Sequence, residues 1–401
     1  MKEPAEATSA GPVASSGEAS YIVQIDPVDP LLFGDNRPAR AGIDHVVRDK
    51  DPSPLVFHGA IGAYVQTACG GAWPEGVLGK PHGDILDAPA DGSTAELLGY
   101  CYADPSGRLW FPKPLHFRCT RSARGWPPLA HDLILPRANE PGDEATSCPL
   151  ALVLDAPPIK DEEESAMLVS ARILARILRG FAGPRAPLNS NEALGLTDVY
   201  AREPRPGVGI DNRIGRADEG ILFVRPYRRF KRADPDPALT ALGYGFTAWF
   251  RCRAPLELVH TVGDVGFLGG DRMRARLSFR LMEGMSALED MKEEVANAVA
   301  GTRGLLAYLL TPMIWDGAWP KLDKRGPIAA SIGRAQYASG WNAPHGHPRP
   351  LHVLVPAGSV FFYEWPNGRP DPEIVRKGWL SSVSQRGACA GFGRVLVGVW
   401  R

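Results

Sequence analysis

The segment YGFTAWFRCR, residues 244–253, predicts a β-strand, because aromatic residues and Thr are frequent in strands. The residues before it, 220–230, predict a partner strand, so that the two form a hairpin with a long loop. RARLSFRL at Arg274–Leu281 alternates polar and apolar side chains and predicts a third strand. These three segments indicate an antiparallel, loop-rich sheet.

Helices and further strands are expected on both sides of these segments. Pro-Ser-Pro at 52–54 precedes apolar residues at helical spacing and predicts a helix over 55–69. An acidic start and one apolar face predict a second helix over 161–183, and Ser286 with Glu289 forms a capping box for a third. Strands are expected at 21–25, 109–112, 305–310, 351–355, 359–365 and 395–400.

This mixture of elements indicates an α+β fold. The 44 Gly and 38 Pro among 401 residues exclude a long coiled coil or a helical bundle. At roughly 150 residues per domain, the length suggests two or three units. The simplest fit is two ferredoxin-like (RRM-like) domains with long loop insertions, at 21–200 and 201–401, after a disordered tail at 1–20.

Several protein classes are disfavoured by the composition. No apolar run reaches the ~18 residues that a membrane span needs, and the first 20 residues lack the basic start and apolar centre of a signal peptide. The six cysteines never have the paired spacing of a zinc site. We therefore expect a cytoplasmic protein with reduced thiols, no membrane partner, no cofactor and no metal.

The charge of the chain is unevenly distributed. Its 45 basic and 45 acidic residues cancel, but residues 201–280 carry 15 basic and 9 acidic side chains, a net of +6. Arg, Gly and aromatic residues interleave in 202–216, 225–232 and 271–276, a mixture that suits RNA backbones and stacked bases. Solvated hairpins are an equally good interpretation of these segments alone.

Catalytic motifs are scarce. The chain has no G-x-S-x-G nucleophile elbow, and the glycine-rich residues 387–394 lack the Lys-Ser/Thr end of a phosphate-binding Walker loop. That segment predicts an exposed hairpin turn flanked by Arg386 and Arg394. The imidazoles of His345, His347 and His352 favour a surface loop over a metal site.

His58 follows the Pro-Ser-Pro segment and has no visible catalytic partner. It is interpreted as a contact at the start of the helix or as a donor that faces a ligand; a general base for RNA cleavage is the alternative.

The same segments resemble the RAMP superfamily of CRISPR effector proteins, and within it the family of third subunits of type III-B Cmr complexes. The resemblance covers nearly all of residues 21–401 and rests on the order of its motifs. The matching segments are 29–38 (DPLLFGDNRP), 52–54 (PSP), 59–60 (GA), 109–114 (LWFPKP), 203–211 (EPRPGVGID), 216–220 (RADEG), 269–272 (GGDR), 310–312 (LTP), 356–360 (PAGSV), 391–393 (GFG) and 397–400 (VGVW). The N-terminal tail and the insertion at 120–163 are not part of the pattern.

The resemblance implies a non-catalytic subunit that binds the 5′ handle of the crRNA. Its implied partners are that RNA, a large polymerase/cyclase-like subunit and a backbone RAMP subunit. Together with the excess of basic residues in 201–280, the resemblance predicts these RNA-binding residues: Arg37, Ser53, His58, Arg205, Arg213, Arg216, Arg272, Arg274, Arg386, Gly391, Gly393 and Arg394. Two alternatives stay open, a crRNA-processing endoribonuclease of the same superfamily with His58 as general base, and a scaffold that contacts only proteins.

Overall fold

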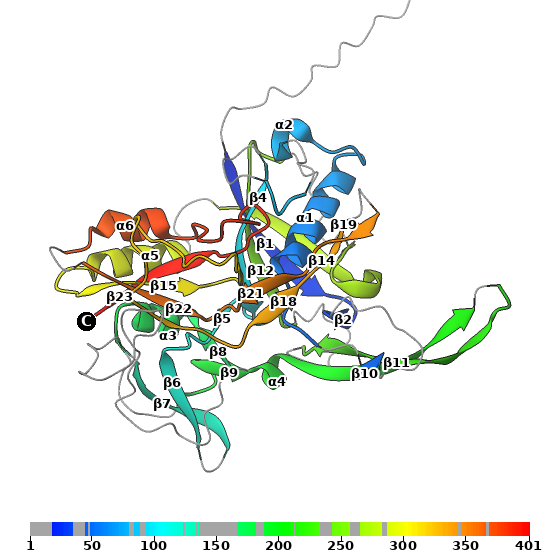
Figure 1. Cartoon of the computed structure of the whole chain (residues 1–401), viewed down its shortest axis with the longest axis horizontal. Helices are drawn as coiled ribbons and strands as arrows, with labels where there is room; N and C mark the ends of the chain where they lie inside the picture. The colour runs from blue at the N-terminus through cyan, green and yellow to red at the C-terminus, as the bar shows by residue number, and fades with distance from the viewer. Residues whose placement is uncertain are drawn as a thin grey trace, which may run out of the picture.

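A computed structural model shows a strand-rich α+β protein built on two main antiparallel sheets (Figure 1). It describes residues 18–34, 45–46, 49–79, 84–88, 94–122, 125–133, 135, 167–181, 188–211, 213–232, 243–256, 265–282, 287–342, 346–365 and 369–401. The expected α+β class is confirmed. Most of the predicted tail at 1–20 and of the insertion at 120–163 lies outside these ranges, although the first strand already begins at Ala19.

The larger sheet has eight strands in the order β13-β14-β1-β12-β4-β5-β8-β9. At its centre the strand from the quoted aromatic segment, β12, pairs with both β1 and β4, so Phe246, Ala248 and Phe250 are fully buried. Helix α1 packs on this sheet through Phe57, Ile61 and Val65. The bounds are β1 (Ala19–Pro27), α1 (Pro54–Ala68), β4 (Glu96–Ala103), β5 (Leu109–Pro112), β8 (Met167–Ser170), β9 (Ala193–Gly195), β12 (Gly245–Cys252), β13 (Val265–Phe267) and β14 (Arg274–Leu281).

The second sheet has the order β17-β22-β15-β23, and three helices pack beside its strand β23. Its strands β15 and β23 are buried along their whole length, as continuous apolar runs such as VLVGVW require. The bounds are α3 (Ala171–Leu178), α5 (Ala287–Asn297), β15 (Gly304–Leu309), β17 (Ala329–Ser331), β22 (Val360–Glu364), α6 (Pro372–Gly378) and β23 (Val395–Trp400).

A long two-stranded arm projects from the larger sheet (Figure 1). Its strands β10 (Tyr200–Asp211) and β11 (Arg216–Phe230) pair antiparallel over most of their length, and β11 also pairs with β2 (Leu31–Leu32) and β3 (His45–Val46). The remaining elements are α2 (Glu75–Leu78), β6 (Phe117–Ser122), β7 (Gly125–Leu133), α4 (Leu196–Val199), η1 (Gly270–Arg272), β16 (Met313–Ile314), β18 (Gln336–Ala338), β19 (Trp341–Asn342), β20 (His347–Pro348) and β21 (His352–Val355).

The structure corrects three expectations about the fold. The predicted hairpin of 220–230 with 244–253 is wrong: β11 pairs with β10, whereas β12 pairs with β1 and β4. Residues 167–170 form strand β8, so the helix expected over 161–183 contains only α3 among its described residues. The division expected at 200/201 does not coincide with a sheet boundary, because β12 and β14 join the sheet of β1 and β4.

One buried arginine fastens the arm to the larger sheet. The Arg228 side chain on β11 is 3% exposed; its Nε donates to Asp49 Oδ1 at 2.7 Å and its Nη2 to the Lys50 carbonyl at 2.7 Å. The guanidinium also lies 4.6 Å from the ring centre of Tyr200. Burial alone would lower the pKa of Arg228, but the Tyr102 and Tyr200 hydroxyls and nearby carboxylates raise it. The guanidinium of Arg228 therefore stays protonated in its buried position.

Replacing Arg228 tests this fastening. Arg228→Met should lower the free energy of unfolding by about 3 kcal/mol, because the buried Asp49 loses its 2.7 Å partner and keeps only the longer contact to the exposed Arg202 at 3.4 Å. Arg228→Lys should recover only part of the loss, since one ammonium cannot reproduce the planar contacts to Asp49, Lys50 and Tyr200. Denaturant unfolding measures both, and a variant as stable as wild type would contradict the assignment.

His116 gives the fold a pH dependence. It is fully buried, and no described residue hydrogen-bonds either ring nitrogen. Burial, with a contribution from Lys113, lowers its pKa from 6.5 to about 3. The neutral imidazole is thus the folded form, so its contribution to stability is complete above pH 6.5 and is lost as the pH falls from 6.5 toward 3.

Unfolding of wild type and His116→Phe should therefore diverge in acid. Phe keeps the ring that packs against Phe362 and cannot bind a proton. We expect the stability of wild type relative to the variant to fall by at most ~1.4 kcal/mol per pH unit below pH 6.5. Parallel pH profiles for the two proteins would contradict this account.

Candidate nucleic-acid interface

Five arginines surround the base of the arm, on β10, β11, η1 and β14; we call them the arm-base surface. Three carboxylates orient four of them, and the fifth, Arg272, lies 5.5 Å from the ring centre of Phe267. Glu203 accepts hydrogen bonds from Arg205 Nε at 2.7 Å and from Arg229 Nε at 2.5 Å. The Arg205 guanidinium also lies 4.6 Å from the ring centre of Tyr227. The five arginines are Arg205, Arg225, Arg229, Arg272 and Arg274.

The other two carboxylates come from the turn after β1 and from the turn before β14. Asp271 accepts from Arg225 Nη1 at 2.6 Å and from the Tyr227 hydroxyl. Asp29 pairs with Arg274 Nε at 2.8 Å. Arg225 and Arg274 still leave 37% and 56% of their side chains exposed, so pairing fixes the guanidinium groups without burying them.

A strained turn presents Asp271 and Arg272. Both have positive φ, 56° and 53°, which is uncommon for residues other than glycine. Gly269 precedes them with φ 81°, and a Cβ there would lie 2.6 Å from the Leu32 carbonyl oxygen, so only glycine fits. Strain of this kind persists where the surroundings enforce it and is concentrated at functional sites.

The arm-base surface keeps a positive charge. Hydrogen bonds from Arg274 lower the pKa of Asp29, and those from Arg229 and Arg205 lower the pKa of Glu203. Asp29 and Glu203 therefore stay ionised at neutral pH. By formal charge, five guanidinium groups against the three carboxylates Glu203, Asp271 and Asp29 leave a net of +2. Guanidinium groups can bind phosphates, and guanidinium and aromatic faces can stack on bases.

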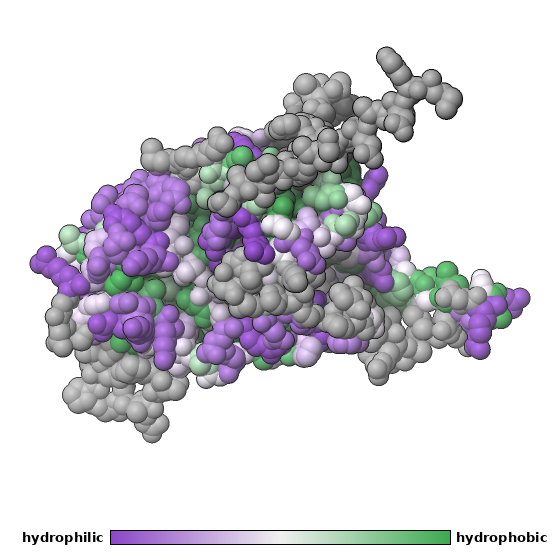
Figure 2. Space-filling view, turned by 90° about the horizontal axis from the view of Figure 1, so that it is seen from above, coloured by the Kyte–Doolittle hydropathy of each residue, from purple (hydrophilic) through white to green (hydrophobic). Residues whose placement is uncertain are grey.

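Arg213 and Arg216 lie at the far end of the arm. Asp211 lies six positions after Arg205 along β10, so Arg213 and Arg216 stand roughly 20 Å from the base of the arm. The Arg213 side chain is 91% exposed. Val208, Ile210, Ile214 and Leu222 are exposed beside them, and Figure 2 shows apolar and hydrophilic side chains next to each other on this projection. The structure thus brings Arg205, Arg272 and Arg274 together at the base of the arm, whereas Arg213 and Arg216 lie at its tip.

Ser53 and His58 lie on α1, which the Asp49–Asp51 segment connects to the arm. The Ser53 hydroxyl caps the helix by accepting from Leu55 N at 3.4 Å, and Pro54 occupies the first turn. His58 Nε2 lies 3.3 Å from the Ala95 carbonyl oxygen. Burial lowers the pKa of His58, the backbone contact raises it, and Arg349 lowers it further. The imidazole is therefore neutral at pH 7 and makes a backbone contact.

The C-terminal glycine loop is buried, which corrects the expectation of an exposed turn. Arg394 is 4% exposed; its Nη2 donates to the Ala388 carbonyl at 2.7 Å and pairs with Glu96 at 3.3 Å. A Cβ on Gly391 would lie 2.7 Å from the Leu97 side chain. The loop packs against β4 in this way because its glycines let the two backbones approach.

The other predicted residues are spread over the molecule. Gly393 has φ 66°, and a Cβ there would lie 2.6 Å from the Ser384 Cβ. Arg386 is exposed and pairs with Asp87 at 2.6 Å. Arg37 lies outside the described residues, as do His345 and Ser286.

The sequence reasoning missed Arg225, Tyr227, Arg229 and the carboxylates that orient them. The segment RPYRRF could have predicted them, because residues two apart in a strand share a face and Arg225, Tyr227 and Arg229 are two apart. Arg225, Tyr227 and Arg229 take the face of the arm-base surface, and Arg228 points to the opposite face and is buried.

Neither a metal cluster nor a membrane-spanning helix is found among the described residues. In the part of the chain that the structure describes, no three His, Cys, Asp or Glu residues gather at metal-binding distances. No helix among the same residues is long and apolar enough to cross a membrane.

Comparisons with known proteins identify the family. No curated protein sequence matches the chain. Two solved structures are similar over 85% of this chain and 86% of theirs, each at 13% identity: a cryo-EM structure of the Type III-B Cmr-beta bound to cognate target RNA (TM-score 0.44) and one bound to cognate target RNA and AMPPnP, state 1 (TM-score 0.42). The family model for the CRISPR-associated protein Cas_Cmr3 matches residues 23–400, so the chain belongs to the Cas_Cmr3 family.

Proposed function

We propose that this chain is a non-catalytic subunit of a cytoplasmic type III-B CRISPR effector complex and that its arm-base surface binds the 5′ handle of the crRNA. Family membership supports the assignment to a CRISPR assembly. The observation that carries the RNA contact is the set of five arginines around the base of the arm, four of which are held by ion pairs that leave their side chains partly exposed. A large polymerase/cyclase-like subunit and a backbone RAMP subunit are the proposed neighbours.

Two ferredoxin-like units form the proposed framework. In the larger sheet, the chain order β1, β4, β12, β14 gives the spatial order β14-β1-β12-β4, with α1 between the first two strands. In the second sheet, the chain order β15, β17, β22, β23 gives β23-β15-β22-β17, with α6 between the last two. The fourth-first-third-second order in each sheet supports the split βαβ assignment.

We propose that RNA phosphates bind the arginines that the three carboxylates hold in the free protein. Glu203, Asp271 and Asp29 hold the arginines extended in the free protein, so less side-chain entropy is lost when phosphates arrive. The pairs leave the guanidinium groups open to solvent, which favours an RNA contact over a scaffold with internally neutralised charge. Because Arg394, Gly391 and Gly393 are buried, they are left out of the proposed contact; Ser53, His58, Arg386 and Arg37 remain candidate residues.

The endoribonuclease alternative is less well supported. His58 contacts the Ala95 carbonyl, and among the described residues the charged group that shifts its pKa is Arg349, a cation. General acid–base cleavage needs a second proton-transfer group close to the first. The described surroundings of His58 favour a helix-packing role.

A double variant tests the arm-base contact. Arg205→Ala with Arg274→Ala should weaken binding to crRNA transcribed from the repeat of the same locus by at least tenfold, because two phosphate contacts are lost. The slope of log affinity against log salt should fall by ~1.4, at ~0.7 per phosphate of a single strand. Fluorescence anisotropy at several salt concentrations measures both.

Arg376→Ala is the matched control. Arg376 is also exposed and ion-paired, to Glu293 at 3.0 Å, but it lies on α6 of the other unit. Its loss should leave RNA affinity within twofold of wild type, and melting temperatures should stay close in all variants, as for other exposed sites. Wild-type affinity in the double variant, or an affinity indifferent to salt, would contradict the proposal.

The purified chain should not cleave RNA. Labelled repeat RNA incubated with the protein, with and without divalent metal, should stay intact on a denaturing gel, and His58→Ala should bind RNA without any change in cleavage. Cleavage by wild type that disappears in His58→Ala would contradict the proposal of a non-catalytic subunit and support the crRNA-processing endoribonuclease.

A further inference from the structure

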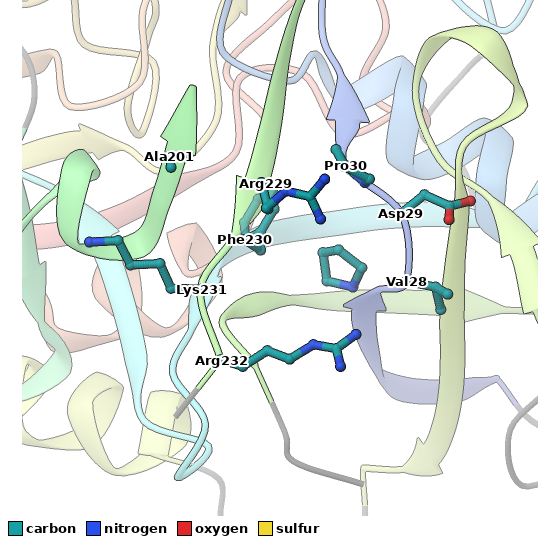
Figure 3. Close-up of a pocket in the computed structure, with 9 residues that line it drawn as sticks. Val28, Asp29, Pro30, Ala201, Arg229, Phe230, Lys231 and Arg232 are labelled. Carbon is teal, nitrogen blue, oxygen red and sulfur yellow. The ribbon is translucent and has the colours of Figure 1, made fainter. Parts of the chain in front are cut away.

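A pocket opens at the base of the arm, where the end of β11 faces the turn after β1. Its volume is about 550 Å³, within the range of roughly 300–1,000 Å³ for small-ligand sites. Pro27, Asp29 and Pro30 line one side, and Arg229, Phe230 and Arg232 line the other (Figure 3).

The charge that faces the pocket is positive. Figure 3 shows the guanidinium groups of Arg229 and Arg232 reaching toward the turn at 28–30, whereas Lys231 points in the opposite direction. The carboxylate of Asp29 points away from Phe230 and is held by Arg274 at 2.8 Å. Arg232 is exposed, and no residue in the described ranges forms an ion pair with it.

The backbone beneath these side chains is fixed. Lys231 N donates to the Val199 carbonyl and Tyr244 N donates to the Lys231 carbonyl, both at 2.9 Å. Arg232 forms an isolated bridge with Gly243, where a Cβ would lie 3.1 Å from the Lys231 oxygen. Glycine therefore allows the close approach that holds Arg232 at the rim of the pocket.

Apolar rings supply the second part of the site. The half-buried Phe230 ring packs edge-on against Phe246 with 5.2 Å between centroids and lies 5.7 Å from Tyr200. Pro27 and Pro30 line the same pocket. Rigid aromatic and proline surfaces beside guanidinium groups are what one nucleotide of single-stranded RNA needs for its base and its phosphate.

We propose that this pocket holds one nucleotide of the bound RNA, with its phosphate between Arg229 and Arg232 and its base or sugar against Phe230 and the two prolines. The inference rests on the proposed function and adds a discrete subsite to it. The pocket adjoins the arm-base surface through Arg229, which also pairs with Glu203, and through the Asp29–Arg274 pair. An RNA strand on that surface can therefore place one nucleotide in the pocket.

Arg232→Ala in the full chain tests the subsite, with Lys231→Ala as the matched control. The two cations are adjacent and both exposed, but only Arg232 reaches into the pocket. Affinity for the labelled crRNA should fall five- to tenfold in Arg232→Ala, with a loss of ~0.7 in the salt slope, and less than twofold in Lys231→Ala. Photocross-linking with 4-thiouridine RNA should label residues 27–30 or 229–232 in wild type.

The outcomes separate the subsite from the wider function. Wild-type affinity in Arg232→Ala, with binding still lost in the Arg205→Ala, Arg274→Ala variant, would overturn the subsite and keep the arm-base contact. Wild-type affinity in both would overturn both. Adenosine or uridine monophosphate alone should bind only weakly; tight binding of either that RNA does not displace would make the pocket a site for free nucleotides and would also overturn the inference.

Discussion

The burial of Arg228 is the constraint on which the proposed interface depends. A two-stranded ribbon is marginally stable alone, and the arm needs an attachment that fixes its direction as well as its position. The buried guanidinium supplies this with hydrogen bonds to Asp49, to the Lys50 carbonyl and to the Tyr102 hydroxyl on β4. Because strand side chains alternate, burial of Arg228 commits its neighbours Tyr227 and Arg229 to the opposite face.

Preorganisation then accounts for the chemistry of that face. Immobilising an arginine side chain lowers its conformational entropy. The ion pairs with Glu203, Asp271 and Asp29 already restrict these side chains before RNA binds. Exposed pairs of this kind add little to stability, so their geometry is better explained by binding than by folding. The strained turn at Asp271 agrees, since its positive φ places a carboxylate between Arg225 and Tyr227.

The sequence predicted the individual elements better than their assembly. Helix α1 and strands β5, β15, β22 and β23 lie within one residue of their expected bounds, because their apolar patterns and prolines are local signals. The pairing of β12 with β1 brings residues more than 200 positions apart together, and no local pattern encodes it. An insertion that contains the arm separates β4 from β12, which is why the expected division at 200/201 cuts through a sheet.

The candidate site shows the same limit. Net charge pointed to residues 201–280, and Arg205, Arg272 and Arg274 do lie together, but charge alone did not distinguish the buried Arg228 from the exposed Arg229. The glycine loop was misjudged for a related reason. Its glycines admit the close approach of β4, and its arginine neutralises the buried Glu96, whereas a phosphate contact would use the same residue types.

Arginine footprinting of the assembled complex tests the central claim most directly. Phenylglyoxal modification, measured by mass spectrometry before and after ribonuclease digestion, reports which guanidinium groups RNA covers. The account predicts that Arg205, Arg225, Arg272 and Arg274 are protected while RNA is present and become reactive after digestion, with Arg376 reactive throughout. Equal reactivity of the four arginines with and without RNA would contradict it.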